Sequence, residues 1–353
     1  MYQSGRIDES RAAALEALRS PVEQERDAGA LFIVFNVFYD QFPAALAVLK
    51  AALPRLQGDF NTCAAVAYAA WFTDDAELCH RAGQRCIGLN PENALGYLRV
   101  GLLALGKRQF VDAFCALSAG RLHCPVDGQI NGWYNLAKQL AKGNRKVRFS
   151  FDGVEYTFGL AVFNGHAMET AAQHVTGMLC EPEELRLVRK LVLQCDTVVE
   201  VGALVGNHTM FFAKTLRPKK VYVFDAYAPA VEQLKENVAL NGLDQGGTTV
   251  TVRHAAVAAK AGHMRIFDQE VDVVCLDDEV KEKVDFIKID VDGMEMEVLE
   301  GCRGLIARDR PKMMIEVQRG LKDRFRAFAE QYGYSIVGEI GRQADTNFFL
   351  VPK

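Results

Sequence analysis

The sequence has no long apolar segment, either near its beginning or further along the chain. Its first twenty residues carry charged side chains at short intervals, among them Arg6, Glu9 and Arg19. A secretory signal needs an uninterrupted apolar core, and a membrane-spanning helix needs about eighteen or more consecutive apolar residues. We therefore expect neither a signal peptide nor a membrane span, and we predict a cytoplasmic protein.

Cysteines are present, but not in the arrangements that bind metals or build disulfide frameworks. There are 9 of them, an odd number, and no two form a C-x-x-C pair. They are scattered through apolar segments, where a thiol behaves as a small hydrophobic side chain. We predict reduced cysteines in the core or at the surface, and no metal site.

The chain also lacks an excess of positive charge. It has 41 lysines and arginines against 45 aspartates and glutamates, which gives a formal net charge of -4. Nonspecific nucleic-acid binding depends on many Lys and Arg contacts with phosphates, and single-stranded bases stack on aromatic side chains. Because no basic stretch with interleaved aromatic residues occurs, no nucleic-acid partner is predicted.

What the chain does contain is enough apolar material for two domains. Its 353 residues are 50% hydrophobic and 24% charged, as in ordinary globular proteins. The polar, glycine-containing stretch Ala141–Lys146 predicts a boundary between residues 1–142 and 143–353. In the second domain, residues 147–158 alternate around Asp152–Gly153 as a hairpin does, and an amphipathic helix is expected over Glu181–Leu193.

The first domain, residues 1–142, is rich in alanine and leucine and contains a repeat. Pro91 and Pro125 stand 34 residues apart, which is the period of tetratricopeptide repeats. In the register ending at Pro125, aromatic, aliphatic and small residues fall at the motif positions: Tyr97, Val100, Gly101, Ala113, Leu117 and Gly120. Looser copies are suggested by Ala67, Cys79, Gly83, Cys86 and Leu89, and before them by Ala45, Leu49 and Ala52.

These repeats resemble a short tetratricopeptide array, with a generic helical bundle as the simpler alternative. In such an array, small residues let neighbouring helix pairs close up and share a continuous core with a concave face. The array would bind a protein partner, a carrier-bound substrate or a second subunit in a homodimer. The sequence does not select among these partners.

The second domain contains a strand, a glycine-containing loop and a helix in succession. Thr197–Val201 is short, β-branched and bounded by glycine, as a buried parallel strand is. Gly202 allows a tight turn, and Gly206 lets the loop and the next helix approach a ligand closely. A second strand, Val221–Phe224, leads into Asp225, whose carboxylate can accept ribose hydroxyls at the sheet edge. The pattern predicts a pocket for a nucleoside cofactor.

Two features indicate which cofactor this is. Position 204 is leucine where a dinucleotide-binding loop has its middle glycine, so a pyrophosphate loses its usual support. S-adenosylmethionine has no pyrophosphate. At the carboxyl-terminal end, Tyr334–Ile340 and Thr346–Val351 predict a closing hairpin around Gly341, which resembles the antiparallel ending of class I methyltransferases. An NAD-dependent enzyme is the alternative that the loop leaves open.

The segment Phe286–Gly301 resembles the I-K-x-D-x-E-G-x-E-x-x-x-L-x-G element of the FkbM methyltransferase family. Val201–Thr209 matches the first motif of that family, and shorter matches occur at Leu240–Leu243, Cys275–Asp278 and Pro311–Glu316. The resemblance covers roughly residues 180–353. The chain departs from the family pattern at three positions: Leu204 for a small polar residue, Glu200 for aspartate and Asp292 for glutamate.

This resemblance implies an α/β fold: a Rossmann-like class I methyltransferase domain, with a mostly parallel seven-stranded sheet and an antiparallel last strand, preceded by an all-α tetratricopeptide-like domain. It also implies an S-adenosylmethionine-dependent O-methyltransferase whose acceptor is a hydroxyl of a sugar, glycan or secondary metabolite. The alternative is a noncatalytic interaction protein with a degenerate methyltransferase domain, which Leu204 favours.

We expect the cofactor at the carboxyl edge of the sheet. Glu200 would bind its ammonium through the loop, Asp225 would take the ribose hydroxyls, and His254–Ala256 would leave room for the adenine. The predicted cofactor-binding residues are Glu200, Gly202, Ala203, Leu204, Gly206, Asn207, His208, Thr209, Asp225, Ala226, His254, Ala255, Ala256 and Asp290.

Methyl transfer mainly requires that the sulfonium carbon be held in line with a nucleophile about 3 Å away. The predicted catalytic residues are Asp290, Glu295 and His208. Asp290, at a strand end, is the first choice for orienting the acceptor or removing its proton. Glu295 begins a helix, where a structural role near the helix dipole is equally open, and His208 is either a general base or a hydrogen-bonding residue of the cofactor loop. Glu316, at the end of the next strand, gives a third carboxylate that can converge on the site.

Overall fold

The structure is a computed structural model that describes residues 59–243, 247–266, 269–291, 293–342 and 345–353, together with isolated positions before residue 59. The chain divides into two compact units, residues 1–145 and 146–353, so the division falls inside the predicted polar break. Of the earliest suggested repeat copy, Leu49 is described and buried, whereas Ala45 and Ala52 lie outside the described residues.

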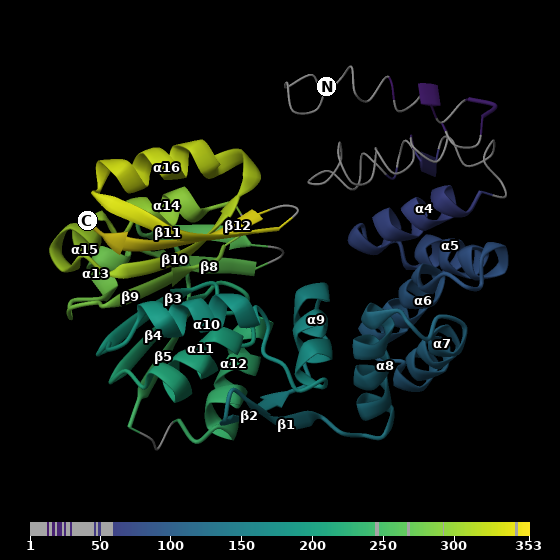
Figure 1. Cartoon of the computed structure of the whole chain (residues 1–353), viewed down its shortest axis with the longest axis horizontal. Coiled ribbons are helices and arrows are strands. Elements are labelled where there is room, and N and C mark those ends of the chain that lie inside the picture. Colours follow the sequence, from purple (N-terminus) through teal and green to yellow (C-terminus); the bar gives the residue numbers. More distant parts are fainter. Residues whose placement is uncertain are drawn as a thin grey trace. The chain divides into compact units, whose positions relative to one another are not determined.

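The first unit contains consecutive helices over residues 60–141 (Figure 1). They are α4 (Phe60–Phe72), α5 (Ala76–Leu89), α6 (Ala94–Gly106), α7 (Phe110–His123) and α8 (Gly128–Ala141). The starts of α4, α6 and α8 are 34 residues apart, as are those of α5 and α7. Side chains of Asp59, Asp75, Asn93 and Asp127 accept backbone hydrogen bonds at four of these starts, which fixes where the helices begin. The prediction of a helical first domain is confirmed.

Small residues allow these helices to pack closely. A Cβ atom added at Gly101 of α6 would lie 2.5 Å from Leu117 Cγ of α7. One added at Gly120 of α7 would meet Tyr97 of α6 and Ile130 of α8. Real Cβ contacts are never this short, so the glycines permit the close helix approach that the repeat pattern predicts.

The second unit is built on a seven-stranded sheet (Figure 1) with the strand order β11-β12-β10-β9-β3-β4-β5. These strands are β3 (Thr197–Val201), β4 (Lys220–Asp225), β5 (Thr249–His254), β9 (Phe286–Ile289), β10 (Lys312–Gln318), β11 (Tyr334–Gly341) and β12 (Asp345–Pro352). The five strands from β5 to β10 are parallel neighbours, and β12 runs antiparallel to both β10 and β11. The predicted mostly parallel sheet with an antiparallel last strand is confirmed.

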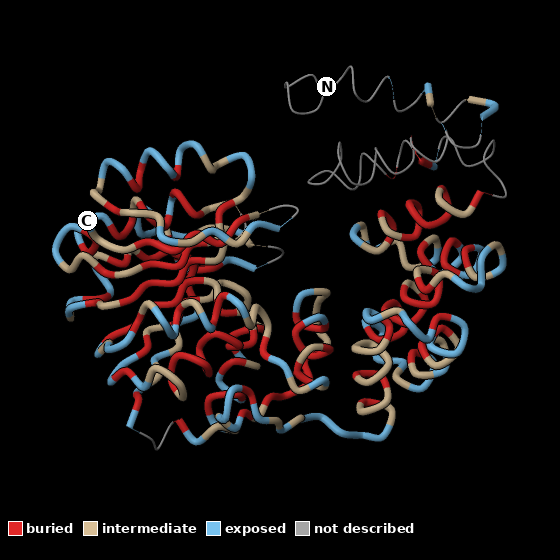
Figure 2. The backbone as a smooth tube through the Cα atoms, viewed as in Figure 1, coloured by how far each residue is buried: buried red, intermediate tan, exposed pale blue. Residues whose placement is uncertain are grey.

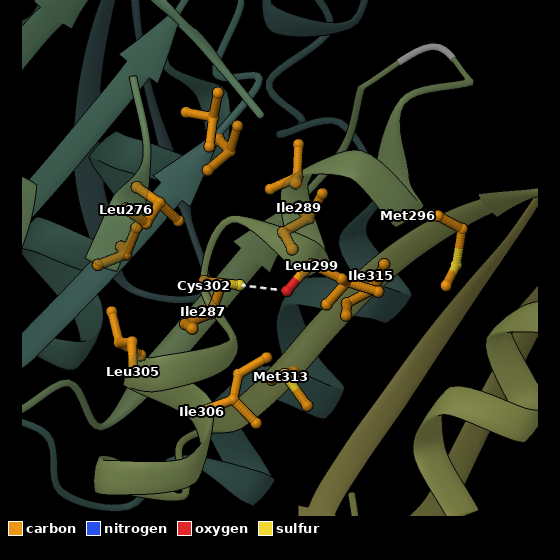
Figure 3. Close-up of a cluster of buried hydrophobic side chains, with 14 of the residues drawn as sticks. Leu276, Ile287, Ile289, Met296, Leu299, Cys302, Leu305, Ile306, Met313 and Ile315 are labelled. Carbon is orange, nitrogen blue, oxygen red and sulfur yellow. Dashed lines mark hydrogen bonds between the residues drawn. The ribbon is translucent and has the colours of Figure 1, made fainter. Parts of the chain in front are cut away.

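Side chains alternate between the two faces of this sheet, and each face has its own core. Val199, Ile287 and Ile315 belong to the core on one face. Figure 3 shows Ile287 and Ile315 within this core. That face packs against α13 (Leu276–Glu279), α14 (Glu295–Glu300), α15 (Arg303–Asp309) and α16 (Lys322–Gln331). Val198 and Phe286 point to the other. It is covered by α10 (Pro182–Leu191), α11 (Asn207–Phe211), the π-helix η4 (Phe212–Leu216) and α12 (Ala228–Leu240). Within the second unit, Figure 2 shows buried residues along the strands of the sheet.

The remaining elements surround the sheet. The hairpin of β1 (Lys146–Phe151) and β2 (Val154–Gly159) turns at Asp152 and Gly153, which have φ angles of 48° and 82°. A helix, α9 (Gly165–His174), follows it, and η5 (Arg319–Leu321) is a short 3-10 turn. A small sheet of β6 (Ala256–Val257), β8 (Gln269–Val274) and β7 (Gly262–Ile266) was not predicted. Among the helices described, none combines the length and apolar character needed to cross a bilayer.

Candidate functional site

A row of charged side chains interrupts the apolar strands at the carboxyl edge of the sheet. Glu200 of β3 stands beside Lys288 of β9 in the parallel register, and the pairing of Ile289 with Ile315 brings Asp290 and Glu316 next to one another. Since Glu200 and Lys288 alternate with residues of the other core, they lie on the sheet face that α10 and α11 cover. This edge holds the candidate active site.

The loop after β3 is held in an unusual backbone conformation. Gly202, Leu204 and Gly206 have φ angles of 79°, 49° and 83°. A Cβ at position 202 would overlap the carbonyl oxygen of Asp290, so only glycine fits there. Leu204 adopts the left-handed conformation without being glycine, which stores strain at this loop. Its side chain is partly buried against a small apolar cluster that includes Phe163.

Asp225 braces this loop from the end of β4. Its Oδ2 accepts hydrogen bonds from the amides of Ala203 and Leu204 at 3.0 and 2.8 Å, and its Oδ1 accepts one from Tyr227 N at 2.9 Å. Burial raises the pKa of Asp225, and the three amides oppose this rise. A carboxylate offers about four acceptor positions, so about one is left for a ribose hydroxyl. The residues therefore fit the predicted ribose site, although with less room than two hydroxyls require.

The residues predicted to face the adenine lie beside Asp225. His254 is the register partner of Asp225, and its Nε2 lies 3.1 Å from the carbonyl oxygen of Ala226. His254 is exposed, while Ala255 and Ala256 are buried. The structure thus brings all of these predicted residues to one end of β4 and β5. That they line an adenine pocket stays a prediction.

Lys288 connects the two strands that carry the site. Its side chain is 2% exposed, and its Nζ donates to Gly202 O at 2.7 Å and to Asp290 Oδ2 at 2.8 Å. Glu200 Oε1 lies 3.9 Å away. Although burial lowers the pKa of Lys288, the charges of Asp290 and Glu200 raise it above its ordinary value. An ammonium ion therefore sits between the cofactor loop and Asp290, whose side chain is 33% exposed.

Glu200 faces the interior rather than the loop surface. It is fully buried, and its Oε2 accepts a hydrogen bond from Thr209 Oγ1 at 2.6 Å. Burial raises the pKa of its carboxyl group, and the Lys288 ammonium opposes this. Glu200 thus accepts a hydrogen bond from Thr209 and pairs with Lys288 inside the protein. Their direct contact with a cofactor stays a prediction.

Glu316 is hydrogen bonded to Asp290. Burial, together with the charges of Asp290 and Asp345, raises the pKa of Glu316 to about 10, so it holds a proton at neutral pH. Glu295 is 1% exposed and accepts a hydrogen bond from Gly293 N at 3.3 Å, which orders the turn after β9. Asp292, in the same turn, lies outside the described residues. Of the two predicted catalytic carboxylates, Asp290 is therefore the partly exposed one and Glu295 the buried one.

His208 and Asn207 fasten the start of α10 to α11. His208 Nε2 lies 3.1 Å from Glu181 Oε2, and both side chains are almost fully buried. Asn207 accepts from Cys180 N at 2.9 Å and donates to Cys180 O at 3.1 Å. Arg342, between β11 and β12, pairs with Glu181. Although burial acts in the opposite direction, His208 and Arg342 lower the pKa of Glu181 to about 2.

The sequence predictions did not assign roles to Lys288, Glu181 or Arg342. For Lys288, the sequence does carry a signal: a lysine inside an apolar strand indicates a buried charge, and a buried charge requires partners. Nothing in the sequence marks Arg342, because its partner Glu184 is 158 positions away. Within the described ranges, no three His, Cys, Asp or Glu side chains are grouped so as to hold a metal ion.

Residues 174–336 match the family model of the methyltransferase FkbM domain. No curated protein matches the sequence. A methyltransferase FkbM from Methylobacillus flagellatus KT is 19% identical, with a TM-score of 0.42, and the match covers 67% of this chain and 65% of that chain. The chain thus spans slightly less than two thirds of that relative.

Two further solved structures are similar over smaller shares of this chain. TrmK of M. capricolum, in complex with S-adenosyl-homocysteine, is 16% identical over 48% of this chain and 67% of that chain, with a TM-score of 0.35. TYW2 of M. jannaschii, in complex with AdoMet, is 16% identical over 59% of this chain and 87% of that chain, with a TM-score of 0.31.

Proposed function

Because residues 174–336 match the family model of the methyltransferase FkbM domain, we propose that this protein transfers a methyl group from S-adenosylmethionine to a hydroxyl oxygen of a sugar, glycan or secondary metabolite. The observation that carries the proposal is the direct contact between the Gly202 loop and Asp290. A cofactor loop and a reachable carboxylate on the next strand are the two parts that methyl transfer to a hydroxyl needs.

When bound, S-adenosylmethionine supplies an electrophilic methyl carbon. Asp225 would hold the ribose with its remaining acceptor position, and the Gly202–Gly206 loop would lie along the methionine part. The His254–Ala256 segment would lie against the adenine. These assignments rest on the bracing of the loop amides by Asp225 and on the position of His254 beside it.

Asp290 would orient the acceptor hydroxyl and take up its proton. Lys288 donates a hydrogen bond to its carboxylate, and the neighbouring Glu316 keeps a proton of its own at neutral pH. His208, the other predicted base, is engaged with Glu181. Glu295 orders the turn behind Asp290. We therefore rank Asp290 first among the three predicted catalytic residues.

Isothermal titration of the purified protein with S-adenosylhomocysteine tests the cofactor assignment. We expect saturable binding in the micromolar range or tighter, followed by methyl transfer from S-adenosylmethionine to some members of a panel of sugars and hydroxylated metabolites, detected by mass spectrometry. Absence of binding at millimolar ligand would overturn the proposal. Binding of NAD in its place would support the alternative of an NAD-dependent enzyme.

A second candidate is a noncatalytic interaction protein, and Leu204 is the observation that favours it. Its side chain is partly buried against the protein's own apolar cluster, in the loop where the family has a small polar residue. This alternative predicts no binding of S-adenosylhomocysteine by the wild-type chain and a gain of binding when Leu204 is shortened.

We also infer that the helical unit is a tetratricopeptide-like array that binds a partner protein or a second copy of the chain. The 34-residue spacing of its helix starts supports this inference. Light scattering of the full chain across a hundredfold range of concentration tests the homodimer, because a constant monomer mass would leave only a different partner. The cytoplasmic location remains a prediction.

A further inference from the structure

We propose that Lys288 is a positioning residue that couples the cofactor loop to the acceptor carboxylate, so that binding at one affects the other. The proposal rests on the proposed function, since it assigns a role within the same site. Its basis is geometric: a single ammonium group donates to the carbonyl oxygen of Gly202 and to the carboxylate of Asp290.

Burying the charged side chain of Lys288 in this strand costs free energy. Its neighbours Phe286, Ile287 and Ile289 are all buried and apolar, and the lysine is 2% exposed. A buried ion pair contributes little net stability compared with well-packed apolar side chains of similar volume. Stability alone therefore does not account for a lysine at this position.

The contacts of Lys288 extend across several elements of the unit. Thr209 of α11 donates to Glu200 of β3, whose carboxylate faces the Lys288 ammonium at 3.9 Å. The ammonium in turn donates to Gly202, in the loop after β3, and to Asp290, after β9. Helix α11 is thus joined to Asp290 through consecutive polar contacts.

Lys288 can act only through its partners. Its own side chain is out of reach of a substrate, whereas Asp290 is 33% exposed. The backbone of Asp290 already lies against the loop, because its amide donates to Val201 O at 2.9 Å and its carbonyl oxygen fills the space beside Gly202. Lys288 adds a fixed direction for the Asp290 carboxylate and for the Gly202 carbonyl together.

A double-mutant cycle read by calorimetric titration with S-adenosylhomocysteine tests this coupling. The proteins are the wild type, Lys288→Met, Asp290→Asn and the double variant. We expect Lys288→Met to weaken binding about tenfold or more, because the loop loses a charged hydrogen bond. Asp290→Asn should weaken binding about threefold in the wild-type background and have no further effect in the Lys288→Met background. Additive losses in the double variant would overturn the proposal.

Lys312→Met is the matched control. Lys312 belongs to the neighbouring strand β10, and its Nζ donates to a backbone carbonyl, Leu191 O, at 2.6 Å, at the opposite end of the sheet. Its removal deletes the same charge and a similar hydrogen bond. Its effect should be additive with Asp290→Asn. Non-additivity with Lys312→Met as well would show that the cycle reports general destabilisation and would overturn the assignment to Lys288.

Removing Lys288 leaves Glu200 buried without its counter-ion, which can prevent folding. In that case the cycle is run in a Glu200→Gln background, where the carboxylate is replaced by a neutral amide and no buried charge is left unpaired at that position. The same non-additivity is expected there, and additivity again overturns the proposal. If the wild type binds no S-adenosylhomocysteine, the proposed function itself fails. If it binds and the losses add, only the coupling fails.

Discussion

The two halves of the sheet's carboxyl edge differ in what shapes them: backbone conformation in one half and side-chain charge in the other. At β3, β4 and β5, the site is shaped by backbone: positive φ angles at Gly202 and Gly206, and loop amides gathered on Asp225. At β9, β10 and β12, it is shaped by side-chain charges, including Lys288 and Glu316. We call the edge at β3, β4 and β5 the cofactor half and the edge at β9, β10 and β12 the acceptor half, after their proposed roles. The stability of the cofactor half should therefore depend on backbone shape, and that of the acceptor half on protonation.

The largest effect is expected from Gly202→Ala in the cofactor half. The added Cβ would overlap the carbonyl oxygen of Asp290, a backbone atom that cannot move aside, and alanine would be strained at a φ of 79°. Together these costs amount to about 4 kcal/mol of unfolding free energy, with loss of S-adenosylhomocysteine binding. Denaturant unfolding and calorimetry measure the two effects.

Gly177→Ala is the control for that change. Gly177 has a φ of 85°, and a Cβ there would meet nothing within 4 Å. It carries the backbone cost without the clash, about 1 kcal/mol. If the two variants were equally stable, the close contact between Gly202 and the carbonyl oxygen of Asp290 would be contradicted.

Glu316→Gln tests the acceptor half through pH. Folding raises the pKa of Glu316 from 4.5 to about 10, so its contribution to stability is complete below pH 4.5 and is lost as pH rises toward 10. Glutamine resembles the protonated form at every pH. The free energy of unfolding of the variant, relative to that of the wild type, should therefore increase by about 1 kcal/mol per pH unit above pH 5. This amounts to about 3 kcal/mol between pH 6 and 9.

Unfolding curves at pH 5, 7 and 9 measure this difference. Glu330→Gln, at an exposed position of α16, is the matched control and should show no such trend. A difference between Glu316→Gln and wild type that stays constant across these pH values would contradict the protonated state of Glu316.

Asp225→Ala should weaken binding of S-adenosylhomocysteine by about 2 kcal/mol, because three backbone amides lose their acceptor. Calorimetric titration measures the loss. Asp277→Ala is the control. It removes a carboxylate that accepts hydrogen bonds from the amides of Gly304 and Leu305, away from the Gly202–Gly206 loop. That control should lose stability but keep its affinity, and unchanged affinity in Asp225→Ala would contradict the ribose assignment.

The smallest effect is expected from Leu204→Gly. Glycine relieves the left-handed backbone strain by about 1 kcal/mol, and the loss of a partly buried side chain offsets most of that gain. Affinity for S-adenosylhomocysteine should change by less than about threefold. Arg217→Gly, at another residue with a φ of 55°, controls for strain relief elsewhere. A hundredfold gain in binding for Leu204→Gly would show that the leucine blocks the site.

Much of the fold was predictable because its signals are local. The apolar strands, the glycines of the 202–206 loop and the 34-residue helix spacing each involve neighbouring residues. The mostly parallel seven-stranded sheet with an antiparallel last strand followed from the resemblance to the FkbM pattern. The three-stranded sheet of β6, β7 and β8 was not predicted. β6 has only 2 residues and β7 is mostly exposed, so neither gives a clear apolar pattern.

The candidate site was predicted less completely. Its location at the ends of the strands follows from the motif, and the structure does bring Asp225, His254 and Asp290 to that edge. The engagement of His208 with Glu181 depends on how α10 folds back onto α11. That contact joins segments whose separate patterns do not specify one another.

The sequence by itself determined the helical character of the first unit, the main strands of the large sheet and where the glycine loop must turn, because periodicity and backbone freedom are properties of adjacent residues. Only the tertiary structure decided the protonation of Glu316 and the pairing of Lys288 with Gly202, a residue 86 positions away. The energy of a charge depends on its burial and on its neighbours in space, and folding alone sets both.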